Sequence, residues 1–134
     1  MAFGGTLYQD IAEQKPGSLP HVNRAHYERN LHPVQIVPGT RLAELYPGLT
    51  SSRINSIHHQ AIKDLAPTFT AEAHCPEDGI VEAVRWRGKS FVAGVQWHPE
   101  FHPRGGGDAS IFDDSPLLQD FLHTARSLRR DATT

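Results

Sequence analysis

The sequence predicts an α/β fold with a mixed sheet, flanking helices and one β-hairpin. Three observations lead to this class. Segments whose apolar residues alternate along the chain are interspersed with segments of helical periodicity. An Asp78-Gly79 turn joins two of the strand-like segments, as in a hairpin. A continuous apolar run over 90–97 is typical of a strand covered on both faces. The length of 134 residues fits one domain.

The first regular segments follow each other closely. HPVQIVPG, residues 32–39, predicts a short strand that ends at Pro-Gly. TRLAELYPG, residues 40–48, predicts a helix with Thr40 as its N-cap and Pro-Gly as its end. SRINSIHH, residues 52–59, alternates apolar and polar side chains and predicts a strand that ends in polar residues.

The second half contains the hairpin and a long helix. We expect the hairpin strands at 68–74 and 80–86 and the buried strand at 90–97. A Gly-rich loop at 105–107 precedes a helix that Ser115-Pro116 opens, with one apolar stripe and arginines near its end. Residues 1–31 show few regular segments, and AFGGTL is typical of a helix that ends in a Gly turn.

Charge and composition exclude several classes of protein. The net charge of -2 gives no electrostatic basis for binding nucleic acid or an anionic membrane surface. No apolar run approaches the roughly 20 residues that span a bilayer. The only cysteine, Cys75, cannot form an internal disulfide and favours a reducing compartment, so we expect a cytoplasmic protein.

The apolar run at 90–97 leads directly into His98, Pro99 and Glu100. In a strand, residues i and i+2 project to the same side, so the Glu100 carboxylate can orient the His98 imidazole. This is the base and orienter part of a nucleophile, base and acid triad. Spacing alone leaves open that the tripeptide is an ordinary loop.

Four stretches in order strengthen the catalytic interpretation: FGGTLYQDI, NSIHHQAI, DGIVEAV and GVQWHPE. Together they resemble the peptidase C26 group of class I glutamine amidotransferase-like hydrolases. The resemblance covers nearly all of residues 1–134, but only the C-terminal half of that family's flavodoxin-like domain. It implies hydrolysis of gamma-glutamyl amides by a Cys-His-Glu mechanism, with His98 as general base and acid and Glu100 as its orienter.

The same resemblance implies that the nucleophile is absent. The family's Gly-x-Cys-x-Gly elbow precedes the helix that ends in FGGTLYQD, so it would fall before Met1. Cys75 lies in the hairpin turn, with no elbow and no following helix, and is expected to be a bystander. We therefore expect the chain alone to be inactive, and marginally stable or dimeric through an exposed sheet edge.

The resemblance also places a group of polar residues beside the small gamma-glutamyl substrate: Ser56, His58, His59 and Gln60. We expect no cofactor and no metal, because adjacent His58 and His59 diverge on a strand and His98, Glu100 and His102 show no helical ligand spacing. RGGGDAS is a weak candidate for binding phosphate, because no Lys follows it and its Gly run does not lead from a strand into a helix.

The sequence also leaves open two candidate partners and two alternative functions. An N-terminal fragment carrying the nucleophile, or a second copy of the chain, is a candidate partner. The chain could instead be the glutaminase part of an amidotransferase, or a non-catalytic binding module.

Overall fold

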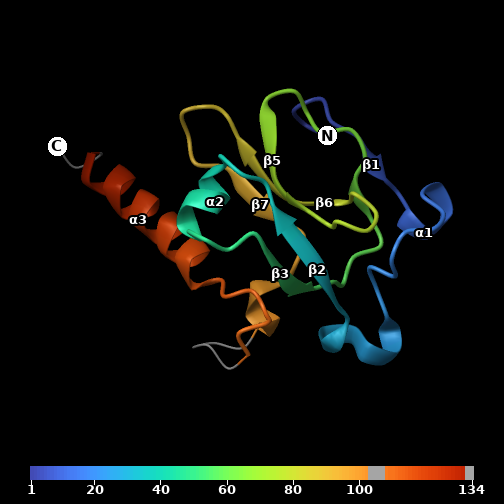
Figure 1. Ribbon diagram of the computed structural model, residues 1–134. Coiled ribbons are helices and arrows are strands. Elements are labelled where there is room, and N and C mark those ends of the chain that lie inside the picture. The colour runs from blue at the N-terminus through green and yellow to red at the C-terminus, as the bar shows by residue number, and fades with distance from the viewer. Residues whose placement is uncertain (103–107, 132–134) are drawn as a thin grey trace.

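A computed structural model describes residues 1–102 and 108–131 and contains a five-stranded sheet, a two-stranded sheet and flanking helices (Figure 1). The elements follow in the order β1 Leu7–Tyr8, α1 Ile11–Gln14, η1 Arg24–Arg29, β2 Leu31–Ile36, α2 Arg41–Leu45, β3 Ser51–Asn55, β4 Ala61–Ile62, β5 Phe69–His74, β6 Val81–Trp86, β7 Ala93–Val95, η2 Pro99–Phe101 and α3 Ser115–Asp131. Here η denotes a 3-10 helix.

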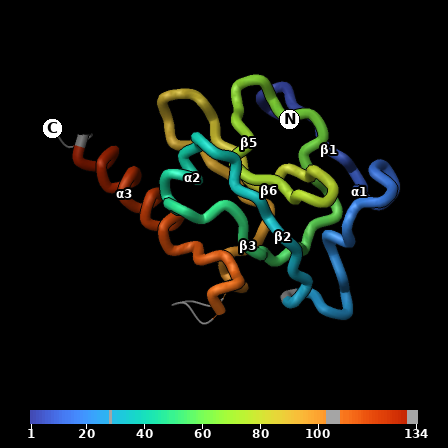
Figure 2. The backbone as a smooth tube through the Cα atoms, viewed as in Figure 1, coloured from blue at the N-terminus to red at the C-terminus, as the bar shows by residue number. Residues whose placement is uncertain are grey.

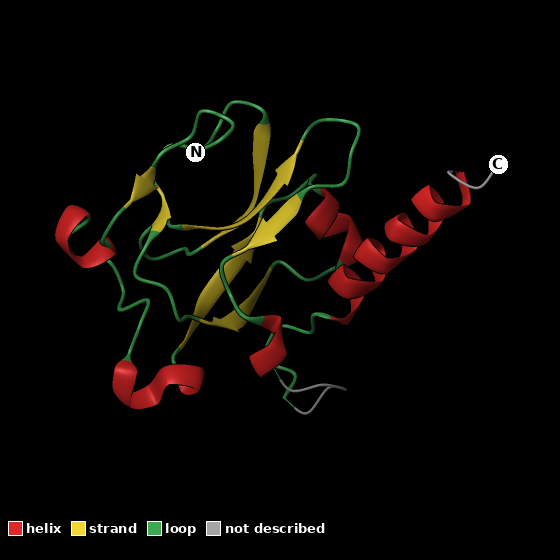
Figure 3. Ribbon diagram, turned by 180° about the vertical axis from the view of Figure 1, so that it is seen from behind, coloured by secondary structure: helices red, strands yellow, loops and turns green. Residues whose placement is uncertain are grey.

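The larger sheet has the strand order β3-β2-β5-β6-β7, and every pairing within it is antiparallel. One isolated parallel bridge joins Arg53 of β3 to Ile111. The smaller sheet pairs β1 with β4. Seen from behind in Figure 3, the sheet lies between α1 and α3. The predicted α/β class is confirmed.

Local sequence signals account for the elements that were predicted closely. Thr40 caps α2, and its hydroxyl accepts a hydrogen bond from the amide of Ala43. The hairpin of β5 and β6 forms as expected. Gly79 closes its turn at φ +73°, a conformation that an L side chain rarely adopts.

Three expectations were wrong in detail. β3 ends at Asn55, so most of NSIHHQ follows the strand. β7 spans only three residues at the edge of the sheet, and Gly94 is exposed, so this strand is not covered on both faces. AFGGTL contains no helix end, because residues 1–4 form a turn in which the amide of Gly4 donates to the carbonyl of Met1. The Gly-rich loop at 105–107 lies outside the described residues.

The main core packs α2 and the segment around Phe112 against one face of the sheet. The Tyr46 and Phe112 rings lie 4.5 Å apart, and Trp97 meets Phe112 edge to face at 5.2 Å. The Tyr46 hydroxyl donates to the carbonyl of Asp113. These contacts hold in the core both Trp97, which precedes His98 in the sequence, and residues 112–114, which follow it.

α3 runs away from the sheet, on the side of the molecule opposite α1 (Figure 2). Part of its predicted apolar stripe is exposed, including Leu118 and Phe121. A cleft of about 590 Å³ lies between this helix, β7 and η2. Within residues 1–102 and 108–131, no helix is long and apolar enough to cross a membrane.

Candidate active site

His98 and Glu100 form a hydrogen-bonded pair at the end of the sheet. His98 Nδ1 lies 2.9 Å from Glu100 Oε1. The contact forms in a 3-10 turn that starts at Pro99, with His98 as its N-cap, rather than along a strand as expected from spacing. A carboxylate can only accept a hydrogen bond, so Nδ1 carries the proton and Nε2 has the lone pair. The pair therefore has the arrangement that a base and its orienter require.

Asn55 holds the main chain of His98 from the end of β3. The amide of His98 donates to Asn55 Oδ1 at 2.8 Å, and Asn55 Nδ2 donates to the carbonyl of His98 at 2.7 Å. Asn55 is 1% exposed. These two bonds tie the His98 backbone to a buried side chain of the sheet.

A second anchor lies on the other side of the turn. His102 Nε2 accepts a hydrogen bond from the amide of Asn55 at 3.1 Å, so its Nδ1 carries the proton and donates to Asp114. Asp114 also accepts from Trp97 Nε1 at 2.8 Å. Both ends of the His98–Glu100 segment are thus attached to buried groups.

The pair itself remains open to solvent. The His98 and Glu100 side chains are 43% and 59% exposed. The hydrogen bond from His98 lowers the pKa of the Glu100 carboxyl below its ordinary value. Glu100 therefore stays ionised and able to orient the imidazole across the neutral range. The catalytic roles of both residues remain predictions.

Cys75 is poorly suited to act as a nucleophile. It lies in the turn between β5 and β6 and is fully buried. Burial raises the pKa of its thiol to about 11, so almost none is thiolate at neutral pH.

The four predicted substrate-binding residues divide into two pairs. Ser56 is fully buried, and its hydroxyl donates to the carbonyl of His21 at 2.9 Å. His58 is directed toward the buried Glu82. His59 and Gln60 are exposed, and Gln60 Nε2 donates to Gln9 Oε1 at 3.0 Å. The substrate role of all four remains a prediction.

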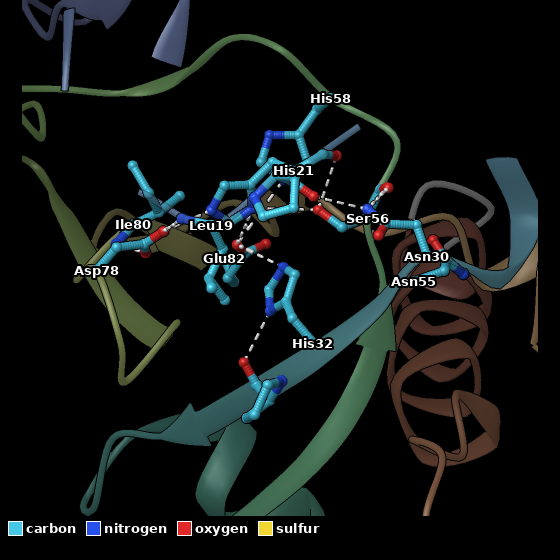
Figure 4. A network of polar contacts seen from close by, with 12 residues as sticks. Leu19, His21, Asn30, His32, Asn55, Ser56, His58, Asp78, Ile80 and Glu82 are labelled. Atoms are coloured by element: carbon cyan, nitrogen blue, oxygen red, sulfur yellow. Dashed lines mark hydrogen bonds and ion pairs between the residues drawn. The ribbon is translucent and has the colours of Figure 1, made fainter. Parts of the chain in front are cut away.

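His58 belongs to a buried polar cluster that sequence reasoning missed, and Ser56 borders it, with its hydroxyl 3.1 Å from His21 Nδ1. Its members are His21, His32, His58 and Glu82, which come from four separate segments (Figure 4). Glu82 lies in DGIVEAV, a stretch noted for its resemblance and for a hairpin strand but not for a site, and His21 lies in a region without regular periodicity. No local spacing signals their meeting.

Comparisons with known proteins agree with the fold and with the motifs. Protein NtpR of Enterococcus hirae is 39% identical over 116 residues, which are 84% of this chain and 47% of that protein. Gamma-glutamyl-gamma-aminobutyrate hydrolase PuuD of Escherichia coli K12 is 37% identical over 108 residues, covering 76% of this chain and 41% of that enzyme. The chain therefore spans less than half the length of these relatives.

Solved structures show the same fold at low sequence identity. A Thermoplasma acidophilum protein assigned as a component of GMP synthase superposes with a TM-score of 0.63 at 16% identity, over 98% of this chain and 54% of that one. The glutaminase domain of Trypanosoma brucei CTPS, with bound acivicin, gives 0.57 at 22% identity, over 73% and 39%. The model of the peptidase C26 family matches residues 1–100, which include His98 and Glu100. This chain belongs to the peptidase C26 family.

Proposed function

We propose that this chain provides the general base and the orienting carboxylate of a hydrolase acting on gamma-glutamyl amides. The observation that carries the proposal is the His98–Glu100 pair, 2.9 Å apart and half exposed on an anchored turn. Homology to an enzyme named gamma-glutamyl-gamma-aminobutyrate hydrolase supports the substrate class.

In the proposed reaction, His98 Nε2 takes the proton of a cysteine thiol as the sulfur attacks the gamma-glutamyl carbonyl carbon. The same nitrogen then gives this proton to the departing amine, which leaves a thioester. His98 next takes a proton from water, and the resulting attack releases glutamate and returns the proton to the thiol. Glu100 keeps the imidazole in the required tautomer and balances its charge while it is protonated.

The nucleophile in this proposal lies outside the 134 residues. Cys75 is the single cysteine of the sequence, and its buried thiol has a raised pKa. We propose that a preceding segment or a separate N-terminal fragment supplies the thiol, and that this partner, or a second copy of the chain, pairs with the exposed edge of β7. Sedimentation of the chain alone tests the second copy, since a purely monomeric protein contradicts it.

We also propose which residues contact the substrate and where in the cell the protein acts. His59 and Gln60 are the better candidates to contact a small gamma-glutamyl substrate, because Ser56 and His58 are engaged inside the protein. The single buried cysteine is consistent with a location in the cytoplasm.

The test is a chimera. The part of E. coli gamma-glutamyl-gamma-aminobutyrate hydrolase that the sequence match leaves out on the N-terminal side is joined to Met1. Release of glutamate is then measured with gamma-glutamyl-aminobutyrate and with glutamine. We expect His98→Ala and Glu100→Gln to lower kcat by at least about 100-fold, while Cys75→Ser and the surface control His123→Ala retain the activity of the chimera.

Two results would refute the proposal. One is an active chimera whose rate is unchanged by His98→Ala. The other is release of glutamate by the unmodified chain that Cys75→Ser abolishes, because Cys75 would then be the nucleophile.

A further inference from the structure

The buried cluster of His21, His32, His58 and Glu82 contains more hydrogen-bond acceptors than donors. Glu82 is the side chain at its centre, and it is 0% exposed. His21 Nδ1, His32 Nε2 and His58 Nε2 lie 3.6, 3.4 and 3.8 Å from Glu82 Oε1. Figure 4 shows these rings directed toward the carboxylate.

The outer nitrogen of each ring already has an acceptor, and this fixes the tautomer. His32 Nδ1 lies 2.8 Å from the carbonyl of Pro33, and His58 Nδ1 lies 2.9 Å from that of Gln60. His21 Nε2 lies 2.8 Å from Asp78. A carbonyl or a carboxylate only accepts, so each outer nitrogen carries the proton. In the neutral rings, the three inner nitrogens therefore present lone pairs.

The inner groups consequently have nothing to bind among the described residues. His32 Nε2, His58 Nε2 and both Glu82 carboxylate oxygens have no hydrogen-bond partner there. The hydroxyl of Ser56 lies 3.1 Å from His21 Nδ1, but it donates to the carbonyl of His21. An ionised carboxylate among lone pairs, shielded from water, is strongly unfavourable unless a proton or a metal cation joins it.

We propose that this cluster is a structural zinc site, with His21 Nδ1, His32 Nε2, His58 Nε2 and a Glu82 oxygen as its four ligands. In a tetrahedral site with metal–ligand bonds near 2.0–2.1 Å, neighbouring ligand atoms lie about 3.3 Å apart. The contacts to Glu82 Oε1 are 3.4–3.8 Å and all four ligand atoms lie within 4.8 Å of one another, so the rings must move closer together to close the site. The Glu82 side chain is 0% exposed and the three histidine side chains are at most 10% exposed, so four protein ligands would leave little access for water, as in structural sites.

The outer hydrogen bonds match the support that metal-binding histidines receive in proteins. Such rings donate their second N–H to a carboxylate or a backbone carbonyl, which sets their orientation and raises their basicity. Here Asp78 supports His21, and two carbonyls support His32 and His58. Asp78 accepts hydrogen bonds from His21 and from the amides of Ile80 and Leu19, as an ionised carboxylate does.

The backbone opens at this position. β2 pairs with β5 through Gln35 and Ile36, and the first part of β2 pairs with no other described strand on that side. Pro33, which lacks an N–H, lies in this unpaired part. From this part of β2, His32 reaches Glu82 on β6, and the His21 ring lies 4.7 Å from the His32 ring and 4.8 Å from the His58 ring.

A neighbouring trio of His21, Cys75 and Asp78 is the weaker candidate. Asp78 already accepts hydrogen bonds from the amides of Leu19 and Ile80 as well as from His21. His21 Nε2 donates to this same carboxylate, so it offers no lone pair to an ion in this trio. This trio therefore lacks a free histidine ligand.

The experiment uses the chain without a polyhistidine tag. Bound metal is measured by mass spectrometry, and Zn²⁺ affinity is measured after chelation by competition with a fluorescent zinc indicator. We expect one Zn²⁺ per chain. Removing a ligand should weaken Zn²⁺ binding more than the 10–100-fold typical of an outer partner, so we expect over about 100-fold for Glu82→Gln and His32→Ala and about 10–100-fold for Asp78→Asn.

Controls separate this site from others. His123→Ala, an exposed histidine on α3, and Cys75→Ser should bind Zn²⁺ as the parent chain does. Substitution with Co²⁺ should give the visible absorption of a tetrahedral ion without a thiolate charge-transfer band. This spectrum, with X-ray absorption to count nitrogen and oxygen neighbours, requires no variant and remains informative if Glu82→Gln fails to fold.

Three outcomes would overturn the proposal. The first is a folded parent chain that binds neither Zn²⁺ nor Co²⁺. The second is parent-like affinity in Glu82→Gln. The third is a nitrogen NMR spectrum, unchanged by added Zn²⁺, in which one cluster ring is an imidazolium, because a proton would then supply the positive charge.

Discussion

Replacing Asn55 by alanine tests how the His98 turn is held. The substitution removes both bonds between the Asn55 side chain and the main chain of His98. A hydrogen bond contributes about 1 kcal/mol net, and a buried group left without a partner costs about 1–3 kcal/mol. His98 is only partly buried, so water can replace some of the loss. We therefore expect the free energy of unfolding to fall by about 2–3 kcal/mol.

The turn should also loosen in a measurable way. Glu100 has a lowered pKa because His98 donates to it. If Asn55 positions His98, then Asn55→Ala should move the pKa of the Glu100 carboxyl back toward its ordinary value. A carbon NMR titration of the labelled carboxyl measures this shift, and urea unfolding measures the stability.

Ser52→Ala is the matched control, because Ser52 lies on the same strand and its hydroxyl makes only a 3.4 Å contact. We expect a change within about 0.5 kcal/mol and no shift of Glu100. The reasoning is refuted if Asn55→Ala costs no more than Ser52→Ala. It also fails if stability falls but Glu100 titrates as before, since Asn55 would then stabilise the sheet without positioning the pair.

Three further predictions concern buried groups. Cys75 is fully buried and its thiol has a pKa raised to about 11. At pH 8 it should therefore react with a disulfide reagent only at the rate at which the protein unfolds. Fast labelling in native buffer would contradict this. Burial raises the pKa of the Tyr46 phenol above 10.0. Because the folded state keeps this proton to higher pH than the unfolded state does, the contribution of the protonated phenol to the free energy of unfolding is complete below about pH 10 and is lost at higher pH. Tyr46→Phe should therefore remove this part of the loss of stability at alkaline pH, as measured by urea unfolding. Arg85→Ala should cost about 3 kcal/mol in the same assay, since it leaves the buried Glu72 carboxylate without its cation, and Arg87→Ala is the exposed control.

Features set by neighbours in sequence were predictable. Thr40 caps a helix that begins at the next residue, and Gly79 supplies a backbone conformation that the hairpin turn requires. His98 and Glu100 also fall in this class, since they lie two positions apart and they meet although the turn is a 3-10 helix rather than a strand. Short spacing restricts side chains enough to bring them together in more than one backbone conformation.

Features set by distant neighbours were not predictable in this way. The apolar run at 90–97 has the composition of a covered strand, but its burial depends on which strands lie beside it, and among the described strands β7 pairs with β6 alone. Asn55 meets His98 across 43 residues. Glu82 is surrounded by histidines that no periodicity groups. In each case the fold brings together residues whose separation in sequence matches neither the helix nor the strand period.

Two adjacent residues connect the candidate active site to the buried cluster. Asn55 holds His98 through its side chain, and Ser56 donates to the carbonyl of His21 beside Glu82. Both lie where β3 ends, so a displacement of this backbone moves both contacts together. If Zn²⁺ orders His21 and His58, it also fixes the loop that leaves β3. The buried ion would then act on the His98 turn through Asn55 without touching substrate, which predicts that Zn²⁺ removal shifts the pKa of the Glu100 carboxyl in the same direction as Asn55→Ala.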